Sequence, residues 1–233
     1  MSRLANLSEI ILPSPESVFR RLQVILDTGY KGHSLYAHLA DSLRRLFVAY
    51  GLAIVSAIPI GLLSGCLPRL RTALDPIISF YRPLPPLAYY TVLVLWMGID
   101  DGSKIALLFL AGFSPLYISS VAGVARMRAD YVNGAKTLGA NSRQIFFYVI
   151  FPVALPDIFV GLRTSLGFMY STLVAAEMVA AISGIGWMVL DASKYLQSDV
   201  IFLGIIVMGL TGIILDALLN FCEKKIIFWK GQN

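Results

Sequence analysis

The residues of this chain that could do chemistry lie inside apolar segments. Glu177 is near the end of the apolar stretch 158–182, and Tyr170, Ser171 and Thr172 are near its middle. An ionisable group in a membrane-spanning segment is a candidate functional residue, because placing it in lipid is expensive. Hydroxyl groups at this depth either line a weak polar path or bond to neighbouring helices, and the sequence leaves both readings open.

A second candidate group begins at Arg82, a few residues into the apolar stretch 77–99. Pro83, Pro85 and Pro86 follow it and are expected to bend or interrupt the helix, which suits a gate in a translocation path. Arg82 either attracts an anion through its charge or extends its guanidinium to the membrane interface. The sequence favours the second account without excluding the first.

The patterns typical of catalytic and metal sites are missing. The chain has no G-x-S-x-G, no H-E-x-x-H and no C-x-x-C, and Cys66 and Cys222 lie far apart. His33 and His38 have no Cys/His cluster near them, and the segment 98–104 is one residue short of a phosphate-loop spacing. We therefore expect no catalysis and no metal site, which argues against a membrane enzyme.

The composition points to a lipid bilayer as the solvent of this protein. Of its 233 residues 57% are hydrophobic and only 14% are charged, and the mean hydropathy is +0.74. A soluble domain carries roughly a quarter charged residues. The formal charge of +5 lies beside apolar segments, where it orients a membrane protein, so we expect no nucleic-acid partner.

Five segments are apolar enough to cross a membrane, so we expect an all-α membrane protein. They are residues 46–67, 77–99, 105–125, 158–182 and 200–221. We expect a surface or amphipathic segment over 1–45, a transmembrane domain over 46–221 and a cytoplasmic tail over 222–233.

The polar stretch 130–141 predicts a short surface helix between the third and fourth spans. An interfacial segment is expected after it, since Pro152 and Pro156 disfavour one straight helix into the fourth span.

Basic residues near the spans predict which ends are cytoplasmic. One side collects Arg69, Arg71, Arg126, Arg128, Lys136, Arg143, Lys224, Lys225 and Lys230. The opposite side has only Lys104 and Lys194 after the second and fourth spans. Five spans would leave the basic N-terminal segment outside, which is unfavourable. Either the start is shortened or this segment lies on the surface as an amphipathic helix.

Small residues recur at every fourth position along the first span. They are Ala49, Ala53, Ala57, Gly61 and Gly65. Small side chains let helix backbones approach closely in lipid, so we expect this stripe to be a packing face.

The segment that starts at Asn133 resembles the EAA motif of ABC importer permeases. That motif has E-A-A, three residues, a glycine, nine residues and then I-x-L-P. Here Asn133, Gly134 and Ala135 hold the first three positions, Gly139 holds the glycine, and Pro152 ends the pattern. The spacing is kept, whereas Asn replaces Glu, so the polar contact made at that position stays open.

The resemblance implies a cytoplasmic coupling helix that docks on an ATPase. Its residues are Asn133, Gly134, Ala135, Lys136, Thr137, Leu138, Gly139 and Ala140. Small residues let such a helix sit close in a groove of the partner. Gly139 can end the helix, because glycine accepts the left-handed conformation.

Further stretches are similar to the nitrate, sulfonate and taurine group of these permeases, with the greatest likeness to taurine permeases. They are residues 12–19, 81–104, 161–192 and 228–231. The resemblance implies a type I importer fold in the cytoplasmic (inner) membrane. Members usually carry one more helix before residue 12, which supports a shortened start.

The resemblance also implies the partners and the mechanism. Two permease copies, expected to be a homodimer, form the pore, two ABC ATPases dock on them, and a periplasmic or lipid-anchored binding protein delivers substrate. ATP and Mg²⁺ belong to the ATPases, so no cofactor is expected in this chain. The chain carries no Walker motif, and ATP hydrolysis is expected in the partner.

We expect translocation of taurine or a related sulfonate by alternating access. Nitrate or another small organic molecule is the alternative within the family, and a secondary transporter is the alternative of another class. The latter would typically show an internal repeat and an ion site at the midplane. Glu177, at roughly 28 Å from the cytoplasmic start of its span, is expected near the outer face. An ionised Glu177 would repel a sulfonate, so we expect a gate or a structural contact there.

Overall fold

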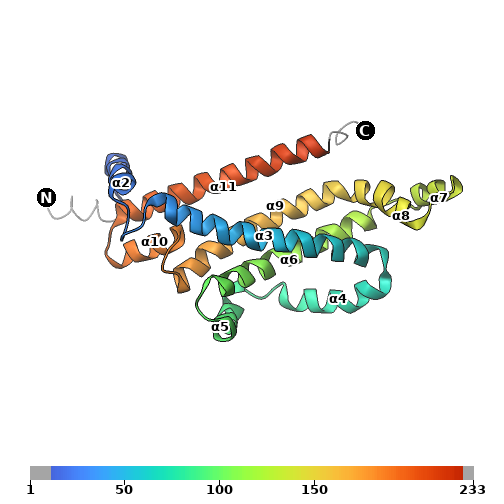
Figure 1. Ribbon diagram of the computed structural model, residues 1–233, viewed down its shortest axis with the longest axis horizontal. Helices are drawn as coiled ribbons and strands as arrows, with labels where there is room; N and C mark the ends of the chain where they lie inside the picture. Colours follow the sequence, from blue (N-terminus) through green and yellow to red (C-terminus); the bar gives the residue numbers. More distant parts are fainter. Residues whose placement is uncertain (1–11, 228–233) are drawn as a thin grey trace. The chain divides into compact units, whose positions relative to one another are not determined.

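The computed structural model describes residues 12–227, and within them the chain is built from helices (Figure 1). The elements are α2 (Pro15–Thr28), α3 (Leu35–Cys66), α4 (Pro68–Tyr81), α5 (Pro86–Met97), α6 (Asp101–Ala125), α7 (Ala129–Thr137), α8 (Ser142–Ile145), η1 (Phe146–Ile150), α9 (Phe151–Ala180), α10 (Ile185–Lys194) and α11 (Ser198–Ile226). The expected all-α membrane class is confirmed. The expectations for residues 1–11 and 228–233 lie outside the described residues.

Four helical stretches of the described chain are long and apolar enough to cross a membrane. They are Leu35–Cys66, Asp101–Ala125, Ser142–Ala180 and Ser198–Ile226. A fifth apolar helix, Pro86–Met97, has 12 residues and rises only about 18 Å at 1.5 Å per residue. That is less than the roughly 30 Å of a hydrocarbon core.

The second expected span, 77–99, is two helices rather than one. Helix α4 ends at Tyr81, α5 begins at Pro86, and a turn between them is closed by the N–H of Leu84 donating to the carbonyl of Tyr81 (3.0 Å). The prolines of this turn cannot donate to a helix ladder and clash with the preceding turn. The predicted interruption at the proline cluster is therefore confirmed.

The fourth expected span begins much earlier than residue 158, and the interfacial segment expected before it is wrong. Helix runs from Ser142 to Ala180. A π-helical turn, Phe146–Ile150, lies directly before Pro152. Such wider turns occur inside α-helices and accompany bends, so the helix continues through a proline that would disrupt a regular ladder.

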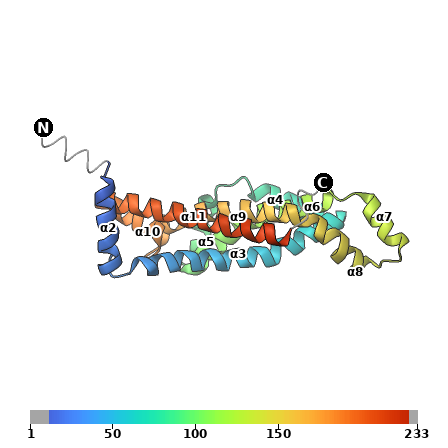
Figure 2. The ribbon, with the colours of Figure 1, turned by 90° about the horizontal axis from the view of Figure 1, so that it is seen from above.

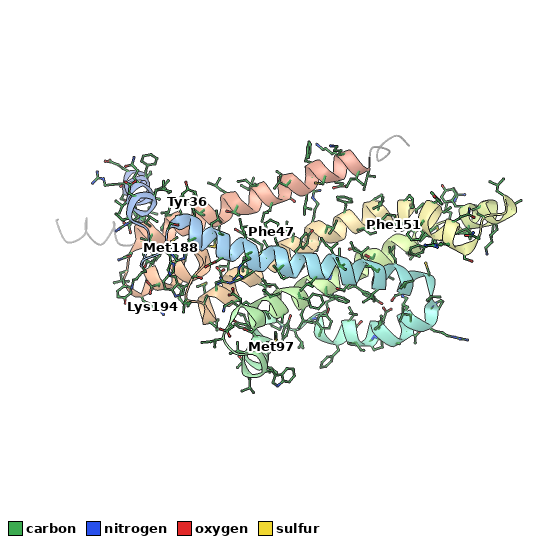
Figure 3. All side chains as sticks on the ribbon, in the orientation of Figure 1. Tyr36, Phe47, Met97, Phe151, Met188 and Lys194 are labelled. Atoms are coloured by element: carbon green, nitrogen blue, oxygen red, sulfur yellow. The ribbon has the colours of Figure 1, made fainter. Side chains whose placement is uncertain are left out.

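The described chain divides into two compact units, each with its own packing. Unit 1 contains residues 12–48, 87–108 and 170–215, and unit 2 contains residues 49–86, 109–169 and 216–227. In unit 1, α2 runs across the beginnings of α3 and α11 (Figure 2). Ile25 of α2 is buried with Met188 of α10 and Leu203 of α11 in one apolar cluster. Met188 and Lys194 mark α10 in Figure 3.

Unit 2 is held by close helix contacts along the predicted stripe of small residues. Ala49, Ala53 and Ala57 are completely buried. A Cβ atom added at Gly61 would come within 2.6 Å of the Cβ of Ser120, and one at Gly65 would meet Val124 at the same distance. The predicted packing face of α3 is therefore confirmed, with α6 as its neighbour.

Candidate functional site

The predicted docking residues lie on helix α7 and in the turn that follows it. No residue of α7 is buried among the described residues, and Leu138, which caps it, is 89% exposed. A Cβ added at Gly134 or Gly139 would meet nothing within 4 Å. The helix ends at Thr137, earlier than the expected boundary at residue 141, and the remaining predicted residues form the turn into α8. The arrangement leaves room for a partner protein around α7.

The turn after α7 depends on Gly139. Its φ of 83° lies in the left-handed region that favours glycine. The N–H of Gly139 donates to the carbonyl of Lys136 (2.9 Å), and the N–H of Ala140 donates to that of Ala135 (3.0 Å). Asn141 then begins α8, where its side chain and that of Gln144 cap the helix reciprocally. The predicted role of Gly139 in ending the helix is confirmed.

Glu177 lies in unit 1, and its carboxylate is paired with Arg45. The Nη1 atom of Arg45 is 2.7 Å from Oε1 of Glu177, and the two side chains are 4% and 1% exposed. The Nε atom of Arg45 also binds Asp101 at 2.7 Å, and Arg44 binds the same carboxylate. These opposite charges offset the cost of burying the guanidinium and the carboxylate.

Hydrogen bonds complete the surroundings of Glu177. The hydroxyl of Ser42 donates to Oε1 (2.7 Å), and the N–H of Gly186 donates to Oε2 (2.9 Å). The Ser42 oxygen accepts the N–H of Ile185 (3.1 Å). Both carboxylate oxygens of Glu177 are therefore engaged by protein groups.

The connection between α9 and α10 is bound to α3 by the same group of side chains. The Ser183 carbonyl accepts from Nη1 of Arg45 (3.0 Å), and the Ser183 hydroxyl donates to Asp41 (2.6 Å). The N–H of Gly184 donates to Nδ1 of His38 (3.1 Å), so the other ring nitrogen of His38 carries the proton and donates to the carbonyl of Tyr30 (3.3 Å). We call these residues the Arg45 cluster: His38, Asp41, Ser42, Arg45, Asp101, Glu177 and Ser183.

Apart from Glu177, the Arg45 cluster is absent from the sequence-based candidates, although the sequence holds a signal for it. His38, Asp41, Ser42 and Arg45 follow the spacing i, i+3, i+4, i+7, which places them on one face of a helix. The apolar segment begins only at residue 46, so hydropathy alone predicts that the helix begins there. It begins instead at Leu35, because the loop before α10 satisfies the polar groups of its first turns.

The three hydroxyl-bearing candidates of the fourth span lie in different surroundings. The Tyr170 hydroxyl donates to the carbonyl of Met208 (2.8 Å), and Tyr170 and Glu177 line one small cavity of about 10 Å³, which is the size of a single water. Thr172 is buried and Ser171 is exposed. Successive residues of a helix point about 100° apart, so these three hydroxyls do not form one polar row.

Arg82, Pro83 and Pro85 lie in unit 2, in the turn between α4 and α5, and all three are exposed. Neither unit by itself brings them together with the hydroxyls or the carboxylate of α9. Within residues 12–227 no group of three His, Cys, Asp or Glu side chains is arranged to hold a metal ion.

The chain is similar to known transport proteins over almost its whole length. Residues 57–228 match the family described as "Binding-protein-dependent transport system inner membrane component". The chain is 40% identical to the taurine transport system permease protein TauC of Escherichia coli (strain K12), over all of this chain and 85% of that protein.

Two further relatives have related names. A protein of Bacillus subtilis (strain 168) assigned to aliphatic sulfonates transport is 33% identical over 98% of this chain and 82% of its own length. The nitrate import permease protein NrtB of Synechocystis is 32% identical over 93% of this chain and 80% of its own length.

Proposed function

Because the chain belongs to the family of binding-protein-dependent transport system inner membrane components, and is thus a multi-pass permease subunit of an inner-membrane importer, we propose that its substrate is taurine or a related sulfonate. The observation that carries the proposal is the 40% identity to a taurine permease along the entire chain. Nitrate is the second candidate, because a nitrate permease is 32% identical.

Membership of this family implies an ATPase and a substrate-binding protein as partners. Beyond that, we propose that two copies of this chain form the pore and that ATP and Mg²⁺ are bound by the ATPase. The chain then supplies no catalytic group and acts by conformational change.

We propose that α7 docks in a groove of the ATPase. Its exposure supports this, and so does the space around Gly134, where a partner surface can approach the backbone. Continuous helix from Ser142 to Ala180 leads from the turn after α7 to Glu177. A displacement of α7 on ATP binding would therefore be carried along α9 rather than absorbed by a loop.

The Arg45 cluster supports a gate at the expected outer end of unit 1. It binds the connection between α9 and α10 to the beginning of α3 through buried, charge-assisted hydrogen bonds. In this proposal the cluster keeps that end closed, and Tyr170 and Thr172 belong to the helix that moves. Arg82, Pro83 and Pro85 would form the flexible joint between α4 and α5.

The test of the docking proposal is Gly134→Trp. Gly134 is helical and exposed with open space around it, so the substitution leaves the fold intact, whereas Gly139→Trp would strain a left-handed residue. Vesicles containing the permease, its ATPase and its binding protein should lose ATP-dependent taurine uptake by about tenfold or more, equivalent to roughly 1.4 kcal/mol of docking free energy. The ATPase should also be lost on purification.

Lys225→Trp is the matched control, since Lys225 is exposed near the end of α11 and is expected on the same side of the membrane. Uptake by this variant should equal that of the wild type. Equal uptake by Gly134→Trp would show that α7 is not the docking helix. If the wild type took up nitrate in preference to taurine, the result would favour nitrate, the second candidate, as the substrate.

A further inference from the structure

The docking helix α7 is joined to the rest of unit 2 through its two ends. Among the described residues, every hydrogen bond and ion pair of residues 128–144 stays inside that stretch, apart from the helical bonds that continue α8 into η1. Figure 2 shows α7 and α8 beyond the end of α6. A displacement of α7 therefore reaches the rest of unit 2 either at residues 126–128 or through α8.

These two ends differ in their backbone structure. On one side, helix continues without interruption from Ser142 to Ala180. On the other side, α6 ends at Ala125, and residues 126–128 form no helix before α7 begins at Ala129. An irregular segment changes its backbone angles more readily than a helix, because no ladder of hydrogen bonds fixes them. Through the backbone alone, a displacement of α7 would reach α9 but would be absorbed before α6.

An ion pair joins the end of α6 to α9 across this irregular segment. The Nη1 atom of Arg126 lies 2.8 Å from Oδ1 of Asp157, and the two side chains are 75% and 13% exposed. The carboxylate of Asp157 has no other hydrogen-bond or ion-pair partner among residues 12–227. Because a largely buried carboxylate is costly without a counter-ion, Arg126 is what allows a charge at this position of α9.

The ion pair lies at one end of a longer contact between α6 and α9. Next to it the two helices approach closely, since a Cβ added at Gly123 would come within 2.9 Å of the Ala154 Cβ. Further along, the Ser165 hydroxyl donates to the Gly112 carbonyl (2.8 Å). Dispersion between apolar groups is weak for each atom pair and has no direction, so the polar bonds fix how the helices are aligned. At the end nearest to α7, that polar bond is the ion pair.

We propose that Arg126 is a positioning residue that makes α6 follow α9 when the ATPase displaces α7. Its guanidinium holds Asp157, so the end of α6 moves directly with α9 and not through residues 126–128. This inference rests on the proposed docking role of α7. Without the ion pair, α9 would move while α6 lagged behind, and ATP hydrolysis would be less tightly coupled to transport.

The test measures taurine taken up per ATP hydrolysed, or nitrate if the wild type prefers it, in vesicles containing the permease, its ATPase and its binding protein. Arg126→Gln and Asp157→Asn should each lower this ratio by about fivefold, the upper end for a partly exposed ion pair. Arg126→Lys keeps the charge and should stay within about twofold of the wild type. In all three variants the ATPase should remain bound on purification and hydrolyse ATP at close to the wild-type rate, because α7 is unchanged.

Arg71→Gln is the matched control, because Arg71 pairs with Asp75 of its own helix (3.1 Å). Its loss removes an ion pair without separating two helices, so the ratio should equal that of the wild type. An unchanged ratio for Arg126→Gln overturns the proposal. Uptake and hydrolysis that fall in equal proportion would overturn it in favour of a purely structural ion pair. Loss of the ATPase from Arg126→Gln would overturn it in favour of a direct docking contact.

The failure of this inference is distinguishable from the failure of the docking proposal. Normal uptake by Gly134→Trp would remove the docking role of α7, and this inference with it. If Gly134→Trp loses uptake while Arg126→Gln keeps the wild-type ratio, the docking role stands and only the positioning role of Arg126 is overturned.

Discussion

Arg45 and Glu177 are two charges that unit 1 buries together. Each has more than one partner: Arg45 binds Glu177, Asp101 and the Ser183 carbonyl, and Glu177 also accepts from Ser42. Removal of Arg45 would leave the buried Glu177 carboxylate without its cation, whereas removal of Glu177 would leave the Arg45 guanidinium with Asp101 as its remaining counter-ion. The cost of such a change is set by the charge left behind rather than by the contact removed.

We predict that Arg45→Gln and Glu177→Gln each lower the free energy of unfolding by about 3–5 kcal/mol. The double variant Arg45→Met/Glu177→Leu should cost less than the sum, because no unpaired charge remains between these two positions. Thermal unfolding of the purified permease in detergent measures the effect. Arg20→Gln is the control, since its pair with Glu16 is exposed and contributes at most about 0.5 kcal/mol. Single variants as stable as this control would show that the buried pair is not structural.

At the scale of the elements, unit 2 depends on close approach between helices. A Cβ added to Gly61 of α3 would come within 2.8 Å of the Tyr117 carbonyl of α6, and one added to Gly161 of α9 would come within 2.6 Å of the Ser119 Cβ. In lipid, helices gain stability from such packing rather than from the exclusion of water. Contact with backbone atoms matters most, because they cannot move aside as a flexible side chain can.

We predict that Gly61→Ala destabilises the permease by about 1–3 kcal/mol through overpacking. Gly51→Ala is the matched control on the same helix, since a Cβ there meets nothing within 4 Å. It should be neutral or stabilise by up to about 1 kcal/mol, because alanine favours the helix over glycine. The two melting temperatures should therefore move in opposite directions. If both variants shifted the melting temperature in the same direction, the result would argue against the contact between α3 and α6.

At the scale of the whole molecule, the N-terminal basic residues are paired with acidic residues of unit 1. Arg21 binds Asp199 at 2.6 Å, and Lys31 lies 3.4 Å from Asp191 and 4.4 Å above the ring of Tyr195. Desolvation lowers the pKa of Lys31, but the hydrogen bond and charge of Asp191 outweigh it, so the pKa is raised. These pairs neutralise part of the positive charge at the expected outer end. The basic N-terminal segment is therefore compatible with the predicted orientation.

The orientation is tested with the two native cysteines. In Cys66→Ser the exposed Cys222 is the only cysteine, and it should react with a membrane-impermeant maleimide in inside-out vesicles but not in intact cells. A cysteine introduced as Lys194→Cys into the Cys66→Ser/Cys222→Ser background should show the reverse. Labelling of Cys222 from outside would invert the orientation and would place α7 away from the ATPase.

The sequence by itself determined the membrane class, the proline break before α5, the approximate position of α7 and the left-handed turn at Gly139 that follows the end of this helix at Thr137. These features depend on local properties: hydropathy, the missing donor of proline, motif spacing and the backbone freedom of glycine. The tertiary structure decided which charges meet. Arg45 and Glu177 are separated by 132 residues, and Tyr117 and Asp75 by 42. Neither pair follows from spacing, because it depends on which helix faces pack together. The same holds for the length of α3, whose polar first turns are stable only because another loop satisfies them.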